Sequence, residues 1–266
     1  MNTLARTLIA AALITGATPL IAAEIDANAA AKGLEIAKEV VRRDTGWGDM
    51  QASMSMTLNN SHGDASVREM RLKSLEVSGD GDKSLTIFDQ PLDVKGTAFL
   101  SFTHPVTPDE QWLYLPALKR VKRISSSNKS GPFMGSEYAF EDLTSFEVEK
   151  YDFEYLRDDA LDGQNVFVVR SFPKYEKSGY TKLEVWIDQS EYRVQKVNFF
   201  DRKGDLLKTL SNQDYKQYLN KYWRPSKASM VNHQNGKSTN LVWSNYQFQS
   251  GLDDGDFNQN SLQRAK

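Results

Sequence analysis

The sequence predicts a mainly β fold: an incomplete, half-open antiparallel β-barrel of about ten strands, with an N-terminal helix and lid loops over an apolar cavity. From Met50 onward, apolar side chains alternate with polar ones, which is typical of strands with one buried face. Short polar turns separate these runs, as in an up-and-down meander. A single sheet of this many strands has to curl, because it otherwise leaves long edges and an unburied face.

Composition excludes several classes of protein. The 266 residues carry 33 Lys and Arg against 35 Asp and Glu, so the chain lacks the basic balance of a nucleic-acid-binding protein. It contains no cysteine, which excludes disulfides, a thiolate nucleophile, a cysteine-bound zinc and a lipid anchor on an N-terminal cysteine. Its three histidines offer few bases or metal ligands. We therefore expect no bound metal.

Residues 1–23 have the pattern of a cleaved secretory signal peptide. Arg6 is the sole charge in this stretch, and an uncharged run follows it and ends in Ile21, Ala22 and Ala23. A positive start, an apolar centre and small residues before the cleavage site define such peptides. A membrane anchor is the alternative, although the uncharged run of about 17 residues is slightly short for a span. We expect residues 24–266 to form a single soluble domain in the periplasm.

The mature chain opens with a predicted helix. Asp26 and Asn28 are candidate N-caps, Arg42 and Arg43 lie in the last turn, and glycines follow at Gly46 and beyond. These are start and stop signals of a helix. The apolar stripe that would pack it on the sheet is formed by Ala30, Leu34, Ala37 and Val41, widened by Ile36 and Val40.

The alternating runs define the strands and the candidate cavity wall. Expected strands cover residues 50–58, 67–77, 83–89, 166–172, 181–187, 193–201, 206–215, 223–231 and 239–248. One face of such a half-open barrel would enclose a cavity that could take acyl chains, or the same side chains could fill a solid core. The side chains predicted to point inward and bind lipid are Met54, Met56, Met70, Leu72, Leu85, Ile87, Phe99, Trp112 and Tyr114.

Residues 96–146 interrupt this meander. Phe133 and Met134 lie between two glycines in a polar loop, so they could form a mobile lid over the cavity, or a plug that packs into the core. A basic run precedes them. It could contact lipid headgroups or a membrane surface, or it could keep an edge strand from aggregating. The run consists of Lys119, Arg120, Lys122 and Arg123.

The same stretch resembles a known family. It reads W-L-Y-L-P-A-L-K-R-V-K-R-I, then G-P-F-M-G-S, then Y-A-F-E-D-L, and is similar to the LolA-like branch of the outer-membrane lipoprotein-sorting proteins. The resemblance covers essentially the whole mature chain. It implies an open barrel with a helical lid, an acyl-chain cavity, no cofactor and no covalent chemistry. It also implies work beside an inner-membrane exporter of the resistance-nodulation-division type. In the shorter chaperone of this superfamily an arginine near the first helix latches the lid, and Arg42 and Arg43 fall in a comparable region without a residue-by-residue match.

Patterns of catalysis are weak by comparison. The chain contains no nucleophile elbow, zinc-protease motif, P-loop or dinucleotide fingerprint. Glu137, Glu141 and Asp142 could supply paired carboxylates for glycoside hydrolysis, and Trp223 and Trp243 could stack on sugars. A transmembrane barrel is disfavoured because the faces away from the core are polar. The sequence therefore predicts a soluble, non-enzymatic carrier of lipoprotein or lipid acyl chains towards the outer membrane. A periplasmic glycan-binding module or hydrolase is the alternative.

Overall fold

The computed structural model describes residues 25–264, and the predicted signal peptide lies outside these described residues. They form a sheet of 13 antiparallel strands in the order β6-β5-β4-β3-β2-β1-β13-β12-β11-β10-β9-β8-β7. The first meander comprises β1 (Asp49–Asn59), β2 (Ala65–Leu75), β3 (Lys83–Gln90), β4 (Ala98–Phe102), β5 (Glu110–Leu115) and β6 (Arg120–Arg123). The second comprises β7 (Tyr151–Leu161), β8 (Gln164–Pro173), β9 (Lys182–Asp188), β10 (Val194–Phe200), β11 (Leu206–Tyr218), β12 (Tyr222–Asn232) and β13 (Ser238–Phe248).

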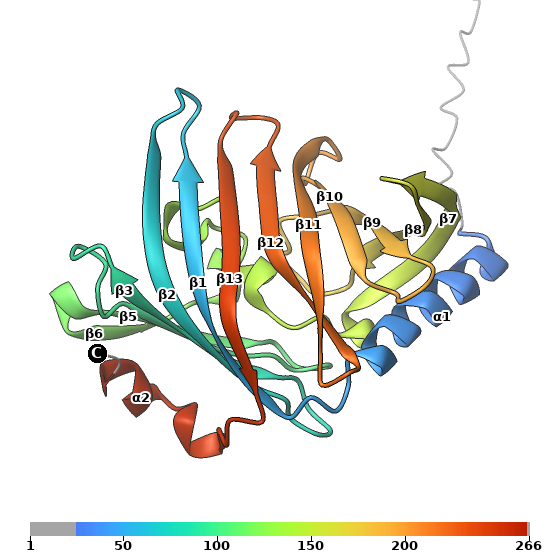
Figure 1. Ribbon diagram of the computed structural model, residues 1–266. Coiled ribbons are helices and arrows are strands. Elements are labelled where there is room, and N and C mark those ends of the chain that lie inside the picture. Colours follow the sequence, from blue (N-terminus) through green and yellow to red (C-terminus); the bar gives the residue numbers. More distant parts are fainter. Residues whose placement is uncertain (1–24, 265–266) are drawn as a thin grey trace, which may run out of the picture.

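The two meanders meet where β1 pairs with β13. Within the described residues, the end strands β6 and β7 each pair on one side, so the sheet curls without closing (Figure 1). This confirms the prediction of a mainly β, half-open antiparallel fold with an N-terminal helix.

The strand count of about ten was too low. The interruption expected over residues 96–146 is shorter, because β4, β5 and β6 continue the meander. Apolar residues cover both faces of β4, whose first four residues are all buried, so the alternation that marks a half-exposed strand is absent. Strand β7 was also missed, although it forms a hairpin with β8.

Helix α1 (Ala27–Arg43) begins where predicted, with the Asp26 carboxylate accepting from the backbone N–H groups of Asn28 and Ala29. It packs along β7 on the concave side of the sheet. A Cβ at Gly33 would lie 2.9 Å from the backbone nitrogen of Tyr155, so this helix approaches the strand more closely than a larger residue allows. Its contact with the sheet buries Ile36, Ala37, Phe153, Val169 and Ile187.

A C-terminal tail, absent from the sequence-based expectation, covers the opposite, convex face of β3, β4 and β5. It ends in the short helix α2 (Gln259–Arg264). Phe257 and Leu262 of the tail are 2% and 0% exposed, in a cluster with Leu85, Leu100 and Trp112. Strands β3 to β5 are therefore covered on both faces.

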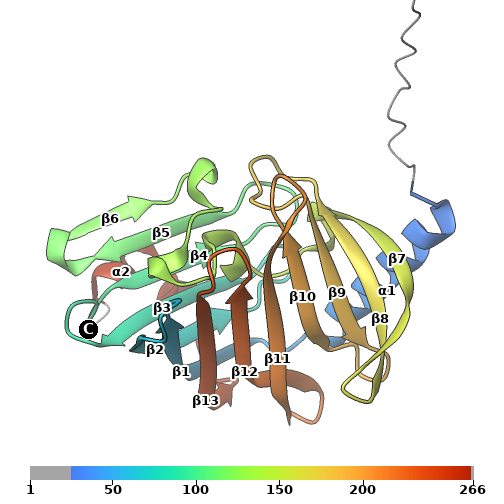
Figure 2. The same cartoon turned by 90° about the horizontal axis from the view of Figure 1, so that it is seen from above.

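The concave face is covered by an irregular segment, residues 124–150, which we call the plug. The plug connects the two edge strands and lies inside the curve of the sheet (Figure 2). Its regular structure is limited to short 3-10 turns, such as Phe133–Gly135 and Phe140–Leu143. The largest apolar cluster of the molecule forms between the plug and the inner sides of both meanders.

Candidate functional site

An open cavity of about 1020 Å³ lies at the end of the concave face where α1 meets β1. Ligand pockets typically measure about 300–1,000 Å³, so this one is large enough for a long organic ligand. Its walls combine apolar and charged side chains. The apolar and aromatic part of the lining comprises Val40, Val41, Trp47, Met50, Val77, Phe146, Tyr192, Val194, Tyr215, Trp223 and Pro225.

The C-terminal end of α1 forms one rim of the cavity and is tied to the sheet. Arg43 donates to the Ser190 carbonyl at 3.1 Å, and its guanidinium lies 4.6 Å from the Tyr192 ring centroid. Asp44, directly after the helix, pairs with Arg224 of β12 at 2.5 Å. Arg42 instead bonds Glu39 within the helix and stays 71% exposed. Of the two arginines considered as a latch, Arg43 is the one that ties α1 to the β9–β10 turn.

Strands β10 to β12 give the cavity a wall of stacked cations and aromatic rings. The Arg193 guanidinium lies 4.6 Å from the Trp223 ring and 5.4 Å from the Tyr215 ring. Asp188 holds Arg193 in place at 2.7 Å. Burial alone would raise the pKa of Asp188, but hydrogen bonds from Arg193, Glu191 and Ser190 lower it to about 2. This pair therefore stays charged at neutral pH and fixes the wall.

The cavity lining also carries carboxylates. Burial, opposed by a hydrogen bond from the Ser145 hydroxyl, raises the pKa of Asp82 to about 6. Burial, followed by repulsion from Asp82, raises the pKa of Glu147 to about 7. Glu76 accepts two backbone N–H bonds from Gly46 and Gly48 at 2.6 and 2.8 Å. Cations and carboxylates are thus mixed in the cavity lining, where Asp44 pairs with Arg224 and Glu191 with Arg43.

Successive cross-strand pairs of residues lead from the cavity to the core beneath the plug. Met50 pairs with Ser74, and Ser74 with Ser84, all three at the cavity wall. Side chains on one face recur at every second residue. The next cross-strand pair on this face therefore contains Leu72, and the pair after it consists of Met54 and Met70. The cavity and the plug-covered core therefore lie on one continuous face.

The plug fills that core with aromatic rings. Phe133 is 1% exposed and lies 5.1 Å from the Phe99 ring, 5.6 Å from Phe140 and 5.9 Å from Phe88. Met134 is partly buried beside it. Of the two interpretations of this pair, the structure adopts the packed plug.

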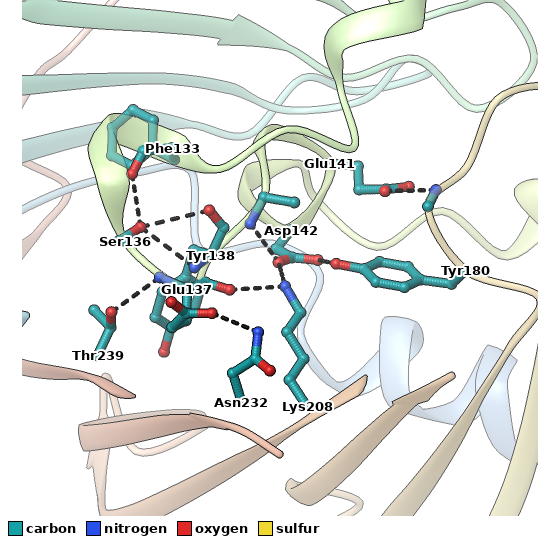
Figure 3. A network of polar contacts seen from close by, with 12 residues as sticks. Phe133, Ser136, Glu137, Tyr138, Glu141, Asp142, Tyr180, Lys208, Asn232 and Thr239 are labelled. Carbon is teal, nitrogen blue, oxygen red and sulfur yellow. Dashed lines mark hydrogen bonds and ion pairs between the residues drawn. The ribbon is translucent and has the colours of Figure 1, made fainter. Parts of the chain in front are cut away.

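Buried polar contacts hold the plug on the second meander (Figure 3). Lys208 of β11 donates to Asp142 at 2.6 Å and to the Glu137 carbonyl at 2.8 Å. Both charged side chains are shielded, at 4% and 6% exposed. Asp142 also accepts from the Tyr180 hydroxyl at 2.8 Å and the Ala139 amide at 2.7 Å. The plug is therefore held on the second meander by a small set of charged and hydrogen-bonded side chains.

Further anchors lie around this pair. The Glu137 carboxylate accepts from the Asn232 amide at 2.7 Å. Glu141 accepts from the Gly179 amide at 2.8 Å, the Ser178 hydroxyl at 2.9 Å and the Tyr175 hydroxyl at 3.0 Å. The three carboxylates considered for glycoside hydrolysis are thus hydrogen-bonded to neighbouring strands and loops. Trp223 lies in the cavity wall, and Trp243 is partly buried against the concave core.

Two buried polar atoms at the plug have no hydrogen-bond partner within the described residues. They are the Tyr138 hydroxyl of the plug and the Gln111 side-chain oxygen of β5 beneath it. The Gln111 amide donates to the Phe140 carbonyl of the plug at 2.9 Å. An unsatisfied buried polar group costs about 1–3 kcal/mol. The packing of plug on sheet is therefore less favourable than its apolar contacts alone suggest.

The predicted lipid-binding residues fall on two faces. Met54, Met56, Met70 and Phe99 share the concave core with the plug, and Leu72 lies on the same face nearer the cavity. The expectation that four others share that face was wrong. They lie on the convex side beneath the tail, because Phe88 and Leu113, rather than their neighbours, supply the inner positions of β3 and β5. These four are Leu85, Ile87, Trp112 and Tyr114.

The basic run lies at the β5–β6 hairpin, at one edge of the sheet. Lys119, Arg120, Lys122 and Arg123 are all exposed. Arg123 pairs with Glu110 at 2.8 Å, whereas the other three have no ion-pair partner among residues 25–264. The run is therefore available to solvent, in agreement with the expectation of a charged edge strand.

The cavity itself was missed by sequence reasoning. Its lining comes from short stretches around turns, such as Gly46 to Gly48 and residues 76–84, and no periodic pattern marks them. The available signal was Trp47 between two glycines. Within the described part of the chain, no group of three or more His, Asp or Glu residues is arranged to bind a metal, and none of its helices is long and apolar enough to cross a membrane.

Several proteins of known structure share this architecture. An outer membrane lipoprotein-sorting protein domain from Vibrio parahaemolyticus is 62% identical, with a TM-score of 0.87, and the match covers 88% of this chain and 100% of that one. A DUF1329 family protein from Desulfovibrio piger is 26% identical, with a TM-score of 0.84, over 88% and 99% of the two chains. A LolA superfamily protein from Nitrosomonas europaea shares the fold at 19% identity, with a TM-score of 0.69, over 86% and 98%.

A family model described as "Uncharacterized protein" matches residues 80–264. None of the curated proteins compared with the chain matches it. The motifs that suggested the resemblance lie within the region covered by these matches, and the relative from Vibrio is similar over its whole length. The chain belongs to the LolA-like family of outer-membrane lipoprotein-sorting proteins.

Proposed function

We propose that this protein is a periplasmic carrier that binds acyl chains of a lipoprotein or lipid on the concave face of its sheet and passes them towards the outer membrane. The observation that carries the proposal is the continuity between an open cavity of about 1020 Å³ and an apolar face covered by an irregular segment. The lipoprotein-sorting description of the relative from Vibrio parahaemolyticus supports the same function.

In this proposal the acyl chain enters the cavity beside Met50 and extends past Leu72 towards Met54 and Met70. The plug yields at its apolar part, Phe133 and Met134, and the chain takes their place on the sheet. Each buried methylene contributes about 0.8 kcal/mol, so a long chain supplies affinity without specific polar contacts. The flexible thioethers of the methionines adapt to chains of different shape.

The charged cavity walls suit the polar end of the cargo. The exposed guanidinium of Arg42 and the stacked Arg193 line the cavity together with Asp82 and Glu147. Cargo would leave when a membrane or an acceptor protein competes for the acyl chain and the plug returns. A periplasmic location agrees with the predicted signal peptide, and an inner-membrane exporter as partner rests on the family resemblance. The proposal assigns no enzymatic activity.

The experiment is mass spectrometry of an organic extract from protein purified without detergent from a periplasm. We expect acyl lipid in stoichiometric amount from the wild type and a large loss from Leu72→Glu, because the new carboxylate lies across the path of the chain. Val67→Glu is the matched control, since Val67 is on the same strand but 49% exposed on the other face.

Leu72→Met completes the set, and we expect it to keep the lipid because it conserves volume and polarity. Circular dichroism establishes that each variant is folded. An empty extract from monodisperse wild-type protein would overturn the proposal. Equal lipid in the wild type and a folded Leu72→Glu variant would overturn the assigned path.

A further inference from the structure

Two exposed leucines lie at the same end of the first meander. Leu92 is 81% exposed in the β3–β4 loop and Leu118 is 67% exposed at the tip of the β5–β6 hairpin. The register Ile87 to Ala98 to Tyr114 brings these two turns to one end of the antiparallel strands. Both turns lie at the left of the molecule in Figure 1. Single exposed apolar residues are common on proteins, but these two occur together at turn tips.

Cations surround the leucines. Lys119 directly follows Leu118, Arg120 and Lys122 extend along β6, and Lys95 lies in the β3–β4 loop with Leu92. Among the acidic residues nearby, Asp89 pairs with Arg71 at 2.8 Å and Glu110 with Arg123 at 2.8 Å. Asp93 lies exposed in the β3–β4 loop beside Leu92 and is outnumbered by the four cations. This end of the sheet therefore combines apolar tips with a surplus of positive charge.

We propose that this end, comprising residues 91–96 and 116–123, is the surface by which the protein docks on a bilayer containing anionic phospholipids. Exposed apolar side chains can enter the headgroup region while lysines and arginines contact the anionic surface. The absence of paired carboxylates around Lys119, Arg120 and Lys122 among the described residues favours a negatively charged partner of this kind.

The position of the surface connects docking with the plug. The β5–β6 hairpin leads directly into residue 124, where the plug begins. Arg68, on the adjoining strand β2, donates to the Met134 carbonyl of the plug at 2.5 Å. A membrane docked on this end would lie next to the segment that covers the concave face. This inference goes beyond cargo binding and is tested separately from it.

The test is co-sedimentation of the full chain with vesicles of phosphatidylcholine alone or of phosphatidylcholine with phosphatidylglycerol. We expect binding to the anionic vesicles that weakens with added salt. The triple variant Lys119→Gln, Arg120→Gln, Lys122→Gln should bind more weakly by about fivefold for each cation, the factor that corresponds to about 1 kcal/mol. Leu92→Ser with Leu118→Ser should also weaken binding, with less dependence on salt.

Matched controls lie elsewhere on the surface. Lys203→Gln with Lys237→Gln removes exposed cations from turns of the second meander, and Val106→Ser removes a side chain that is 86% exposed at the other end of β4. Neither should change vesicle binding, and none of these variants should change the lipid recovered from purified protein. Equal binding by the triple variant and the wild type would overturn the proposal. So would absence of vesicle binding by the wild type, which would leave an acidic protein surface as the partner.

Discussion

The two faces of the first meander are covered in different ways. On the convex side, the tail buries Phe257 and Leu262 against β3 to β5. On the concave side, the plug buries Phe133 and Phe140 against the same strands. The apolar cluster beneath the plug is the larger of the two. The tail leaves no buried polar side-chain atom unsatisfied among the described residues, whereas the plug and the strand beneath it leave two.

The ion pairs of the two covers differ as well. The tail is tied to the sheet by Lys73 and Asp256, which are 30% and 35% exposed. The plug is tied by Lys208 and Asp142, which are almost fully buried. A buried pair contributes little net stability while intact, but removal of one partner is costly. The convex cover is thus tied by a partly exposed ion pair and the concave cover by a buried one, and we propose that only the plug is released.

The largest expected effect comes from breaking the buried pair. Lys208→Met leaves Asp142 without its cation in the core, which typically costs about 3–5 kcal/mol. Because Asp142 is on the plug, we expect the plug to leave the sheet and residues 124–150 to become sensitive to protease. Lys73→Met is the control and should cost about 0–1 kcal/mol, as for partly exposed pairs. Denaturant titration and limited proteolysis measure both. Equal protection of the plug in the two variants would remove the distinction between the covers.

A matched pair of phenylalanines separates stability from function. Phe133→Ala and Phe257→Ala each delete a ring that is at most 2% exposed, and each should destabilise the protein by about 3–5 kcal/mol. Only Phe133→Ala should raise the amount of bound fatty acid, because it opens space beneath the plug. Thermal unfolding and fatty-acid titration give the two readouts. An equal gain in binding for Phe257→Ala would show that the concave face has no special role.

Filling the cavity should weaken acyl binding without unfolding the protein. Met50→Trp projects a larger side chain into the cavity wall and should remove contact with about two methylenes, a loss of about tenfold in affinity. Val242→Trp, at a position of β13 that is 45% exposed, is the control for adding an indole to a central strand. If Met50→Trp binds fatty acid as tightly as the control does, the chain does not pass this wall.

The smallest effect concerns pH. Folding raises the pKa of Asp82 to about 6 and of Glu147 to about 7, in both cases mainly through burial. The folded state therefore binds more protons than the unfolded state in this range, so stability is greatest below the unfolded pKa values and falls as pH rises through about 6 to 7. Urea titration at a series of pH values measures the slope. Asp82→Asn with Glu147→Gln should flatten it, and an unchanged slope would assign it to other groups.

Much of the fold followed from the sequence because its strands alternate. Residues such as Met54 and Met70 show the two-residue period of a half-buried sheet. The N-cap Asp26 and the basic Arg43 in the last turn mark the two ends of α1. Alternation of apolar and polar residues could not assign the faces of strands that are buried on both sides. In β3 and β4 apolar residues occupy both sides, so alternation could not assign Leu85 or Ile87 to the correct face.

The candidate site was harder to predict. The plug was recognised as unusual because Phe133 and Met134 lie in a polar loop, but its anchors include residues of β11 and β12 that are more than 60 residues away in the sequence. The cavity gathers Trp47, Glu147 and Arg193 from three separate turns. Such sites depend on tertiary contacts that carry no periodic signal in the chain.

Displacement of the plug by an acyl chain is tested most directly by hydrogen exchange of the protein with and without a bound fatty acid, followed by mass spectrometry of its peptides. We predict faster exchange across residues 131–143 of the plug when the acyl chain is bound, and unchanged exchange across residues 251–264 of the tail. Unchanged or slower exchange of the plug on binding would contradict displacement of the plug by the acyl chain.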